Sequence, residues 1–209
     1  MLKPMNLLEH YARFQRFIEE RLSADIYPEV PMKAHIQITH QMIARLNQVM
    51  PLQDKLVLDC GCGQGLALEE FTKLGAHPIG TTFGEDYQIC KKNGYEVYEM
   101  DQSFLDFEPN SFDVIWCRHA IEHSLFPLFT LRGFYEALRS DGILYIEVPA
   151  PDTDAQHETN KNHYSCFTKK AWTSLFLRSG FSIIDALDLE LKMGNGGGDM
   201  YYTFMLKKT

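Results

Sequence analysis

The chain has 209 residues, of which 45% are hydrophobic and 23% charged, and its formal net charge is −8 at pH 7. This length suits a single domain with a well-buried core. The acidic balance, without a cluster of lysine and arginine, argues against nucleic acid as a partner, because nucleic-acid-binding proteins present a basic face to phosphates. No run of eighteen apolar residues occurs, so the sequence predicts neither a membrane span nor a membrane partner.

Five cysteines are scattered along the chain, at positions 60, 62, 90, 117 and 166. An odd, dispersed set does not form a disulfide framework and indicates a reducing compartment. Cys60 and Cys62 lack the second cysteine pair of a structural zinc site, so we expect them to line a turn. Since no apolar run follows the charges near the N-terminus, the sequence predicts a soluble cytoplasmic protein, and nothing in it fixes an oligomeric state.

The first fifty residues predict two helices ahead of the remaining fold. Between residues 7 and 22, apolar side chains recur at helical spacing, with charged and polar residues between them. Prolines within 25–31 interrupt this pattern, and a second helix is expected over about 34–49, before Pro51. This N-terminal extension, residues 1–51, is either a lid over a substrate or a layer packed on a sheet. Aromatic stripes at helical spacing favour packing.

The stretch from Lys55 to Gly65 predicts a strand, a glycine turn and the start of a helix. An apolar run ends in Asp59, and glycines follow at every second position up to Gly65, before a helix-forming segment over 66–74. Glycine lets the backbone turn tightly and approach a ligand, and the helix N-terminus presents free N–H groups. The dinucleotide pattern G-x-G-x-x-G would need glycine where Leu66 stands. The alternative is a buried strand followed by an ordinary glycine turn.

From residue 55 onward, short apolar strands alternate with helical stretches, which indicates an α/β fold with a mostly parallel sheet covered on both faces. The predicted strands lie near 55–59, 78–82, 96–100, 112–117 and 142–148. The predicted helices lie at about 65–74, 85–93, 127–139 and 168–179. A glycine-rich break from Gly194 to Gly198 separates two further runs, 181–192 and 200–206, which is typical of a terminal antiparallel hairpin.

The order Asp59-x-Gly61-x-Gly63-x-Gly65, with the acid before the glycines, resembles motif I of the class I S-adenosylmethionine-dependent methyltransferases. The resemblance covers residues 52–209 and implies a Rossmann-like domain of seven strands, with the last strand inserted antiparallel between its neighbours. It also implies S-adenosylmethionine as the cofactor. The residues that it places at the cofactor are Asp59, Gly61, Cys62, Gly63, Gly65, Thr81, Thr82, Asp101, Gln102 and Cys117.

The acid after the third predicted strand fits this resemblance. Asp101, with Gln102 beside it, is similar to the family's acid that accepts a hydrogen bond from the adenine amino group. The alternative is an acid that caps a loop.

The end of the second predicted strand departs from the family. Thr81 and Thr82 stand where an acid usually accepts from the ribose hydroxyls, although some bacterial members carry a Gly-Thr pair there. Hydroxyls are weaker acceptors than a carboxylate. Either these threonines or a neighbouring acid, Glu85 or Asp86, would therefore contact the ribose, or the affinity for the cofactor would be modest.

The run after the fourth predicted strand carries His119, Glu122 and His123, which would share a face if the segment were helical. As a bare motif, H-x-x-E-H suggests a zinc peptidase, but the segment follows a strand of a cofactor fold and the sequence identifies no third ligand. The run is similar in position to the Glu-x-x-Glu-His of ubiquinone-biosynthesis O-methyltransferases, which binds a divalent metal. Because His119 replaces the first glutamate, we expect no metal here.

A long polar segment, residues 148–167, follows the fifth predicted strand, where this fold usually builds part of its substrate pocket. It supplies His157, His163 and Tyr164 as groups for substrate contact or proton transfer. For His157 a solvated loop position is an equal alternative, whereas His163 and Tyr164 fit a pocket wall better.

Together these patterns predict a methyltransferase that acts on an oxygen or nitrogen of a small-molecule acceptor by in-line transfer. The expected general base is His119, oriented by Glu122 and His123, with His163 as the second choice. One rival interpretation is a non-catalytic protein that keeps the fold and binds a metabolite or a partner. Another is a nicotinamide-dependent oxidoreductase.

Overall fold

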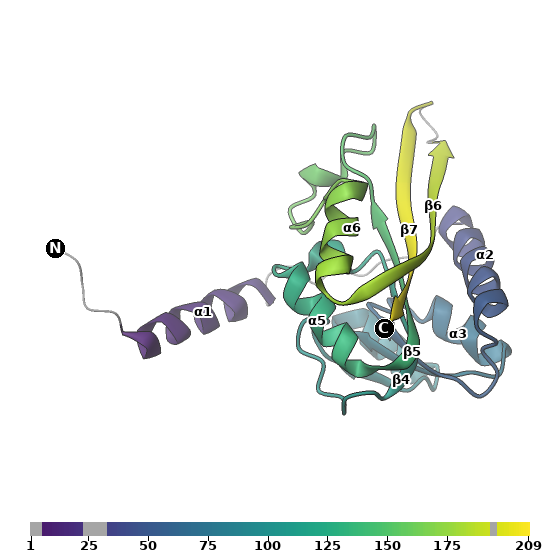
Figure 1. Cartoon of the computed structure of the whole chain (residues 1–209), viewed down its shortest axis with the longest axis horizontal. Helices are drawn as coiled ribbons and strands as arrows, with labels where there is room; N and C mark the ends of the chain where they lie inside the picture. The colour runs from purple at the N-terminus through teal and green to yellow at the C-terminus, as the bar shows by residue number, and fades with distance from the viewer. Residues whose placement is uncertain (1–5, 23–32, 193–195) are drawn as a thin grey trace.

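Seven strands form one sheet at the centre of the protein, within the residues that the computed structural model describes: 6–22, 33–192 and 196–209 (Figure 1). The strand order is β3-β2-β1-β4-β5-β7-β6. The strands are β1 (Leu56–Cys60), β2 (His77–Thr82), β3 (Val97–Glu99), β4 (Phe112–Arg118), β5 (Leu138–Pro149), β6 (Phe181–Lys192) and β7 (Gly198–Lys208). The predicted break within residues 25–31 and the predicted turn residue Gly194 lie outside the described residues.

The parallel part of the sheet is buried on both faces, which explains the continuous apolar runs in the sequence. Leu58 of β1 stands beside Ile79 of β2 and Ile115 of β4, in parallel register. β7 is antiparallel to both of its neighbours, β5 and β6. The expected α/β class and the terminal antiparallel hairpin are therefore confirmed.

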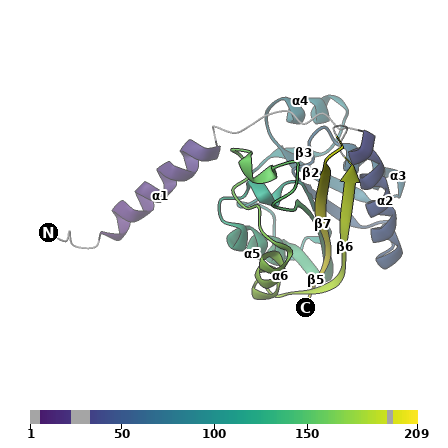
Figure 2. The ribbon, with the colours of Figure 1, turned by 90° about the horizontal axis from the view of Figure 1, so that it is seen from above.

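Helices cover the two faces of this sheet (Figure 2). The described helices and helical turns are α1 (Leu7–Leu22), α2 (Lys33–Val49), α3 (Leu66–Lys73), α4 (Gly84–Lys92), η1 (Ile121–His123), α5 (Pro127–Ala137), η2 (His157–Thr159) and α6 (Lys169–Arg178). On one face, Phe134 of α5 and Trp172 of α6 pack with Leu58. On the other, Leu46 of α2 and Phe71 of α3 pack in a second core cluster. The sheet thus lies between two apolar layers, and its strand ends are left to build a site.

The helix expected over 127–139 is shorter than predicted, because its C-terminal end is drawn into the sheet. Ser111 N donates to the carbonyl of Ala137 at 2.8 Å, and Leu138 already pairs with Phe112 of β4. Residues that read as the end of a helix in sequence are therefore the start of β5.

The two N-terminal helices differ in their packing. α2 buries Ile38, Met42, Ile43 and Leu46 in the core cluster on one face of the sheet. The apolar residues of α1 are largely exposed, with Leu8 79% and Tyr11 62% exposed. Figures 1 and 2 show α1 leading away from the sheet, and its Phe14 ring lies 5.2 Å from that of Phe126. Among the described helices, none combines the length and hydropathy needed to cross a bilayer.

Candidate cofactor and acceptor site

The glycine turn after β1 is held against β2 by its own backbone. The N–H groups of Gly61 and Cys62 both donate to the carbonyl of Thr81, at 2.9 and 3.0 Å. All three motif glycines have positive φ, +75° at Gly61, +49° at Gly63 and +89° at Gly65. A β-carbon at Gly65 would lie 2.8 Å from the Tyr95 ring. Glycine at this position therefore allows Tyr95 to pack closely against the start of α3. At Gly63 the nearest atom would be an Asp86 oxygen 3.9 Å away, so Gly63 faces open space.

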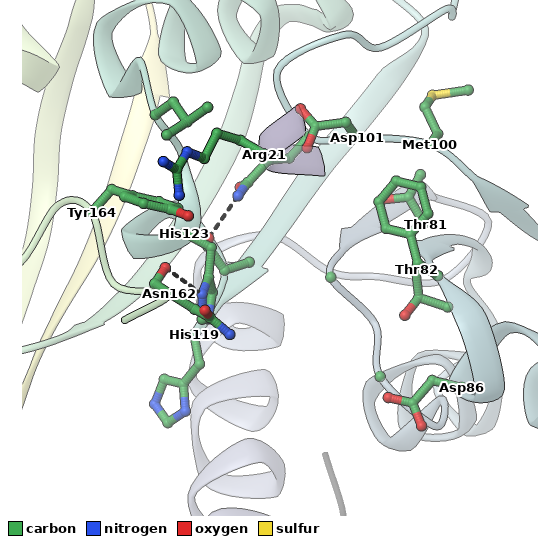
Figure 3. Close-up of a pocket in the computed structure, with 16 residues that line it drawn as sticks. Arg21, Thr81, Thr82, Asp86, Met100, Asp101, His119, His123, Asn162 and Tyr164 are labelled. Atoms are coloured by element: carbon green, nitrogen blue, oxygen red, sulfur yellow. Dashed lines mark hydrogen bonds between the residues drawn. The ribbon is translucent and has the colours of Figure 1, made fainter. Parts of the chain in front are cut away.

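A cavity of about 200 Å³ lies at the carboxyl ends of the parallel strands, where ligands bind in open α/β sheets (Figure 3). Ten of the residues singled out from the sequence line it: Gly61, Gly63, Thr81, Thr82, Asp86, Asp101, Gln102, His119, His123 and Tyr164. The other lining residues are Arg21, Phe83, Met100, Ala120, Leu125 and Asn162. Of the two acids considered for the ribose, Asp86 lines the cavity and is 4% exposed, whereas Glu85 is exposed.

Asp101 serves as a loop cap and also faces this cavity. Its Oδ1 accepts a hydrogen bond from Ser103 N at 2.8 Å, so the loop-capping alternative is confirmed as a contact. Burial raises the pKa of Asp101, and the bonds from Ser103 oppose that rise. Beside it, Gln102 Nε2 donates to the Ala120 carbonyl at 2.6 Å, which ties the loop after β3 to the end of β4. Cys117 does not line the cavity, because it is fully buried beneath Gln102, with its Sγ 3.9 Å from Oε1.

A second cavity of about 80 Å³ adjoins the first, since Gly61, Gly63 and His119 line both. Its other lining residues are His35, Thr39, Asp59, Cys62, Gln64, Leu66, Ala67, Trp116 and Arg118. Asp59 is 2% exposed, and burial raises its pKa to about 8 against the opposing effect of Arg118. The motif I acid therefore faces a small compartment that α2 closes from outside.

His119 has other neighbours than the sequence suggested. Its φ is +51°, and the following 3₁₀ turn spans only Ile121–His123, so the predicted helical face shared with Glu122 and His123 is wrong. Its Nε2 lies 2.8 Å from Glu147 Oε1, and its ring stacks on Tyr201 at 4.4 Å. Figure 3 shows the ring turned away from His123. Burial, with the charge of Arg118, lowers the pKa of His119 to about 4.

Glu147, on β5, joins the ends of two strands into a buried polar network. It is 0% exposed and accepts a hydrogen bond from the Tyr145 hydroxyl at 2.7 Å. Arg118 Nε lies 2.9 Å from the same carboxylate. Burial alone would raise the pKa of Glu147, but His119, Arg118 and the Tyr145 hydroxyl hold it at about 2. The carboxylate is therefore charged at neutral pH and fixes the neighbouring side chains.

Glu122, His123 and His163 form a third group, at the wall of the larger cavity. One ligand atom from each lies within 4.8 Å of the others, so the loop after β5 supplies the third ligand that the sequence analysis did not find. His123 Nδ1 lies 2.9 Å from the Asn162 carbonyl, which fixes the ring and directs Nε2 elsewhere. Burial, with His123 and His157 nearby, lowers the pKa of His163 to about 4. Two imidazoles and a carboxylate suit a zinc- or iron-class divalent ion.

Some residues of the candidate site could not be identified from the sequence patterns used. Arg118 and Glu147 each follow a run of apolar residues in their strands, and a charged residue next to such a run is the signal that could have identified them. Asn162 and Arg21 carry no such signal. His157, for which a solvated position was an equal alternative, is half-buried and lies 2.9 Å from Asp199.

Comparison with known proteins gives the family. A family model described as a methyltransferase domain matches residues 32–186. The ubiquinone biosynthesis O-methyltransferase of Yersinia enterocolitica is 30% identical over 100 residues, 44% of this chain and 41% of that protein. The tRNA U34 carboxymethyltransferase of Helicobacter pylori is 32% identical over 111 residues, 46% of this chain and 41% of that one. The match therefore spans less than half the length of these relatives.

Solved structures share the whole fold at low sequence identity. The Burkholderia thailandensis 1,6-didemethyltoxoflavin-N1-methyltransferase, with 1,6-didemethyltoxoflavin and S-adenosylhomocysteine bound, has a TM-score of 0.64 at 20% identity, over 100% of this chain and 93% of that chain. The [4+2]-cyclase SpnF has a TM-score of 0.69 at 16% identity, over 96% of this chain and 94% of that chain. The chain belongs to the methyltransferase domain family, the class I enzymes that use S-adenosylmethionine.

Proposed function

We propose that the protein transfers a methyl group from S-adenosylmethionine to an oxygen or nitrogen atom of a small-molecule acceptor. The observation that carries this proposal is the continuous space between the glycine turn, Asp101 and the His123 wall. In the proposed arrangement Asp101 contacts the adenine, and Asp86 with Thr81 and Thr82 contacts the ribose. The open space at Gly63 also supports a cofactor-binding role for this turn, since a side chain at position 63 would enter the space proposed for the cofactor.

For the proposed reaction the protein needs only to align the acceptor with the cofactor and to remove one proton from the acceptor. The sulfonium of the bound cofactor supplies an activated methyl group. We assign the proton-accepting role to His123 rather than His119, because the Asn162 carbonyl orients the His123 ring at the cavity wall. His163 and Glu122 stand beside it, and Tyr164 lines the same wall. His119, held by Glu147 and Tyr201, then has a positioning role between the two cavities.

We further propose that turnover needs no metal, although Glu122, His123 and His163 would hold one if it were supplied. A bound divalent ion there would lower the pKa of an acceptor hydroxyl. The imidazole of His123 performs the same task for an acidic hydroxyl or an amine by taking the proton itself. We therefore expect methyl transfer to survive treatment with a strong chelator. Loss of activity on chelation, with recovery on adding zinc or iron(II), would contradict this prediction.

The relatives are named for different acceptors, so they support two classes of acceptor for this protein. A small molecule is favoured by the ubiquinone biosynthesis O-methyltransferase and by the toxoflavin-precursor enzyme, each named for such an acceptor. The carboxymethyltransferase is named for tRNA U34, which makes RNA the second candidate. A net charge of −8 weighs against RNA, because attraction to phosphates supplies much of such binding.

Thermal stabilisation by S-adenosylhomocysteine, followed by a methyl-transfer screen, tests this function. We expect a clear rise in melting temperature and transfer to a hydroxyl- or amine-bearing small molecule in a library. The screen includes unmodified tRNA as a separate arm. Transfer to tRNA alone would overturn the small-molecule proposal. Stabilisation without transfer to any acceptor would favour a binding protein, or a reaction of another kind, as in the cyclase of the same fold.

We propose that the methyltransferase domain begins near residue 52 and that the preceding helices close the site from outside. Arg21, in the last turn of α1, lines the larger cavity, and His35 and Thr39 of α2 line the smaller one. The ring contact between Phe14 and Phe126 places α1 beside the N-terminus of α5. This supports α1 as part of a lid, the alternative that the sequence left open.

A further inference from the structure

The larger cavity carries opposite charges on its two sides. Asp86 and Asp101 are the acids that line it, and they lie where the ribose and the adenine of the cofactor are proposed to bind. Arg21 is the one lysine or arginine among the described residues that line it. Figure 3 shows its side chain reaching from the end of α1 toward Tyr164, on the side of His123 and away from Asp86. A cation on this side indicates an acceptor with a negative charge.

No neighbouring acid neutralises the charge of Arg21. It forms no ion pair with a described residue, and its guanidinium lies 5.9 Å from the centre of the Phe17 ring, one turn back on α1. Glu122, behind the same wall, is 1% exposed and does not line the cavity. The alternative is a solvated surface charge, as for Arg13 and Arg16 of the same helix, which line neither cavity. Arg21 differs from both by its place on the cavity wall.

The anion that best fits Arg21 is a carboxylate. A guanidinium donates two parallel hydrogen bonds to a carboxylate or to a phosphate. A phosphate monoester carries nearly two negative charges at neutral pH, and the net charge of −8 disfavours a dianion more than a monoanion. A carboxylate needs only the single cation that the described wall offers. Arg21 would then hold one end of the acceptor, while His123 faces the hydroxyl or amine at the other.

We propose that Arg21 binds a carboxylate of the acceptor, so that the substrate is a small acid that also carries the hydroxyl or amine to be methylated. This proposal rests on the proposed methyltransferase function and names the class of its acceptor. Arg21 lies outside residues 32–186, the part of the chain that the methyltransferase family model matches. Selection of the acceptor therefore depends on a helix that precedes the family domain.

A methyl-transfer library built of matched pairs tests this assignment. Each hydroxyl- or amine-bearing acid stands beside its own carboxamide, for example 3-hydroxyphenylacetate beside 3-hydroxyphenylacetamide, and every pair with a methylated member is compared. We expect kcat/KM for the acid to exceed that for the amide by about 5-fold to 30-fold, between the values of an exposed ion pair and a buried charged hydrogen bond. The difference should appear in KM rather than kcat, because Arg21 is not proposed to touch the reacting atoms.

Two substitutions on α1 separate this contact from a general effect of charge. In Arg21→Met the ratio of acid to amide should fall to about one, and Arg21→Lys, which keeps the charge, should restore part of it. Arg16→Met is the matched control, since Arg16 is exposed on the same helix and lines neither cavity, and it should keep the ratio of the unmodified protein.

Equal transfer to acids and amides would overturn this proposal, as would a preference for acids that survives Arg21→Met or is lost equally in Arg16→Met. Each of these results would leave the methyltransferase function intact, because a small molecule is still methylated. Transfer to tRNA alone, or to no acceptor, would instead contradict the proposed function, and this inference with it.

Discussion

Replacing Gly63 with valine is expected to abolish binding of S-adenosylhomocysteine while leaving the protein folded. Gly63 lines both cavities, and a β-carbon there meets nothing closer than 3.9 Å, so the added side chain extends into the space proposed for the cofactor. Because that side chain and the cofactor would occupy the same space, we expect affinity to fall at least about a hundredfold, which is about 3 kcal/mol of binding free energy. Titration calorimetry measures the loss directly.

The substitution also strains the backbone, because φ at Gly63 is +49° and a β-branched residue rarely adopts it. Gly94→Val separates the two effects. Gly94 has φ +82°, nothing lies within 4 Å of its would-be β-carbon, and it lines neither cavity. Both variants should lose about 1–3 kcal/mol of stability, but only the Gly63 variant should lose the cofactor. Unchanged affinity in Gly63→Val, or an equal loss in Gly94→Val, would show that this turn is not the cradle.

Removing the imidazole of His123 should slow methyl transfer by about a hundredfold or more, as expected for loss of a general base. His123 lines the larger cavity with its ring fixed by the Asn162 carbonyl at 2.9 Å, and it does not line the smaller one. We therefore expect His123→Ala to keep its affinity for S-adenosylhomocysteine. Single-turnover kinetics with saturating cofactor, alongside calorimetry, separate the chemical step from binding.

His119→Ala is the comparison that tests the assignment. The His119 ring lies against Glu147 and Tyr201 and faces both cavities, so we expect a smaller loss of rate in this variant, accompanied by weaker cofactor binding. The reverse outcome, in which His119→Ala loses turnover with intact binding and His123→Ala remains active, would return the role of base to His119. Loss of turnover only in His163→Ala would assign it to the loop after β5.

The sheet was predictable because its signals are local. The alternating strand and helix patterns, the acid near the end of β1 with the glycines after it, and the acid after β3 are each defined by a few neighbouring residues, and each occurs where the pattern indicates. The prediction that His119 lies on a helical face was wrong for an equally local reason. His119 follows the strand with φ +51°, and only one short 3₁₀ turn comes after it. The sequence pattern assumed a regular helix that the backbone does not form.

The rest of the site depends on contacts between distant segments. Glu147 meets Arg118 and His119 only because β4 and β5 lie side by side in parallel register, which pairs Arg118 with Glu147 directly. His163 joins Glu122 and His123 only because the loop after β5 folds back, with Ser165 N donating to the Glu122 carbonyl at 3.0 Å. Spacing along the sequence carries no information about either of these contacts.

The position of β7 has a consequence for how the protein folds. β7 follows β6 in the chain but lies between β5 and β6, and among the described strands β6 pairs only with β7. β6 cannot join the sheet until β7 has paired with β5, and the pairing of β5 with β7 links residues as far apart as Ile143 and Lys207. Closing so long a loop slows folding, and until it closes the edge of β5 offers unpaired backbone groups to other chains. The yield of refolded protein should therefore depend on how quickly β7 covers that edge, and should fall as protein concentration rises.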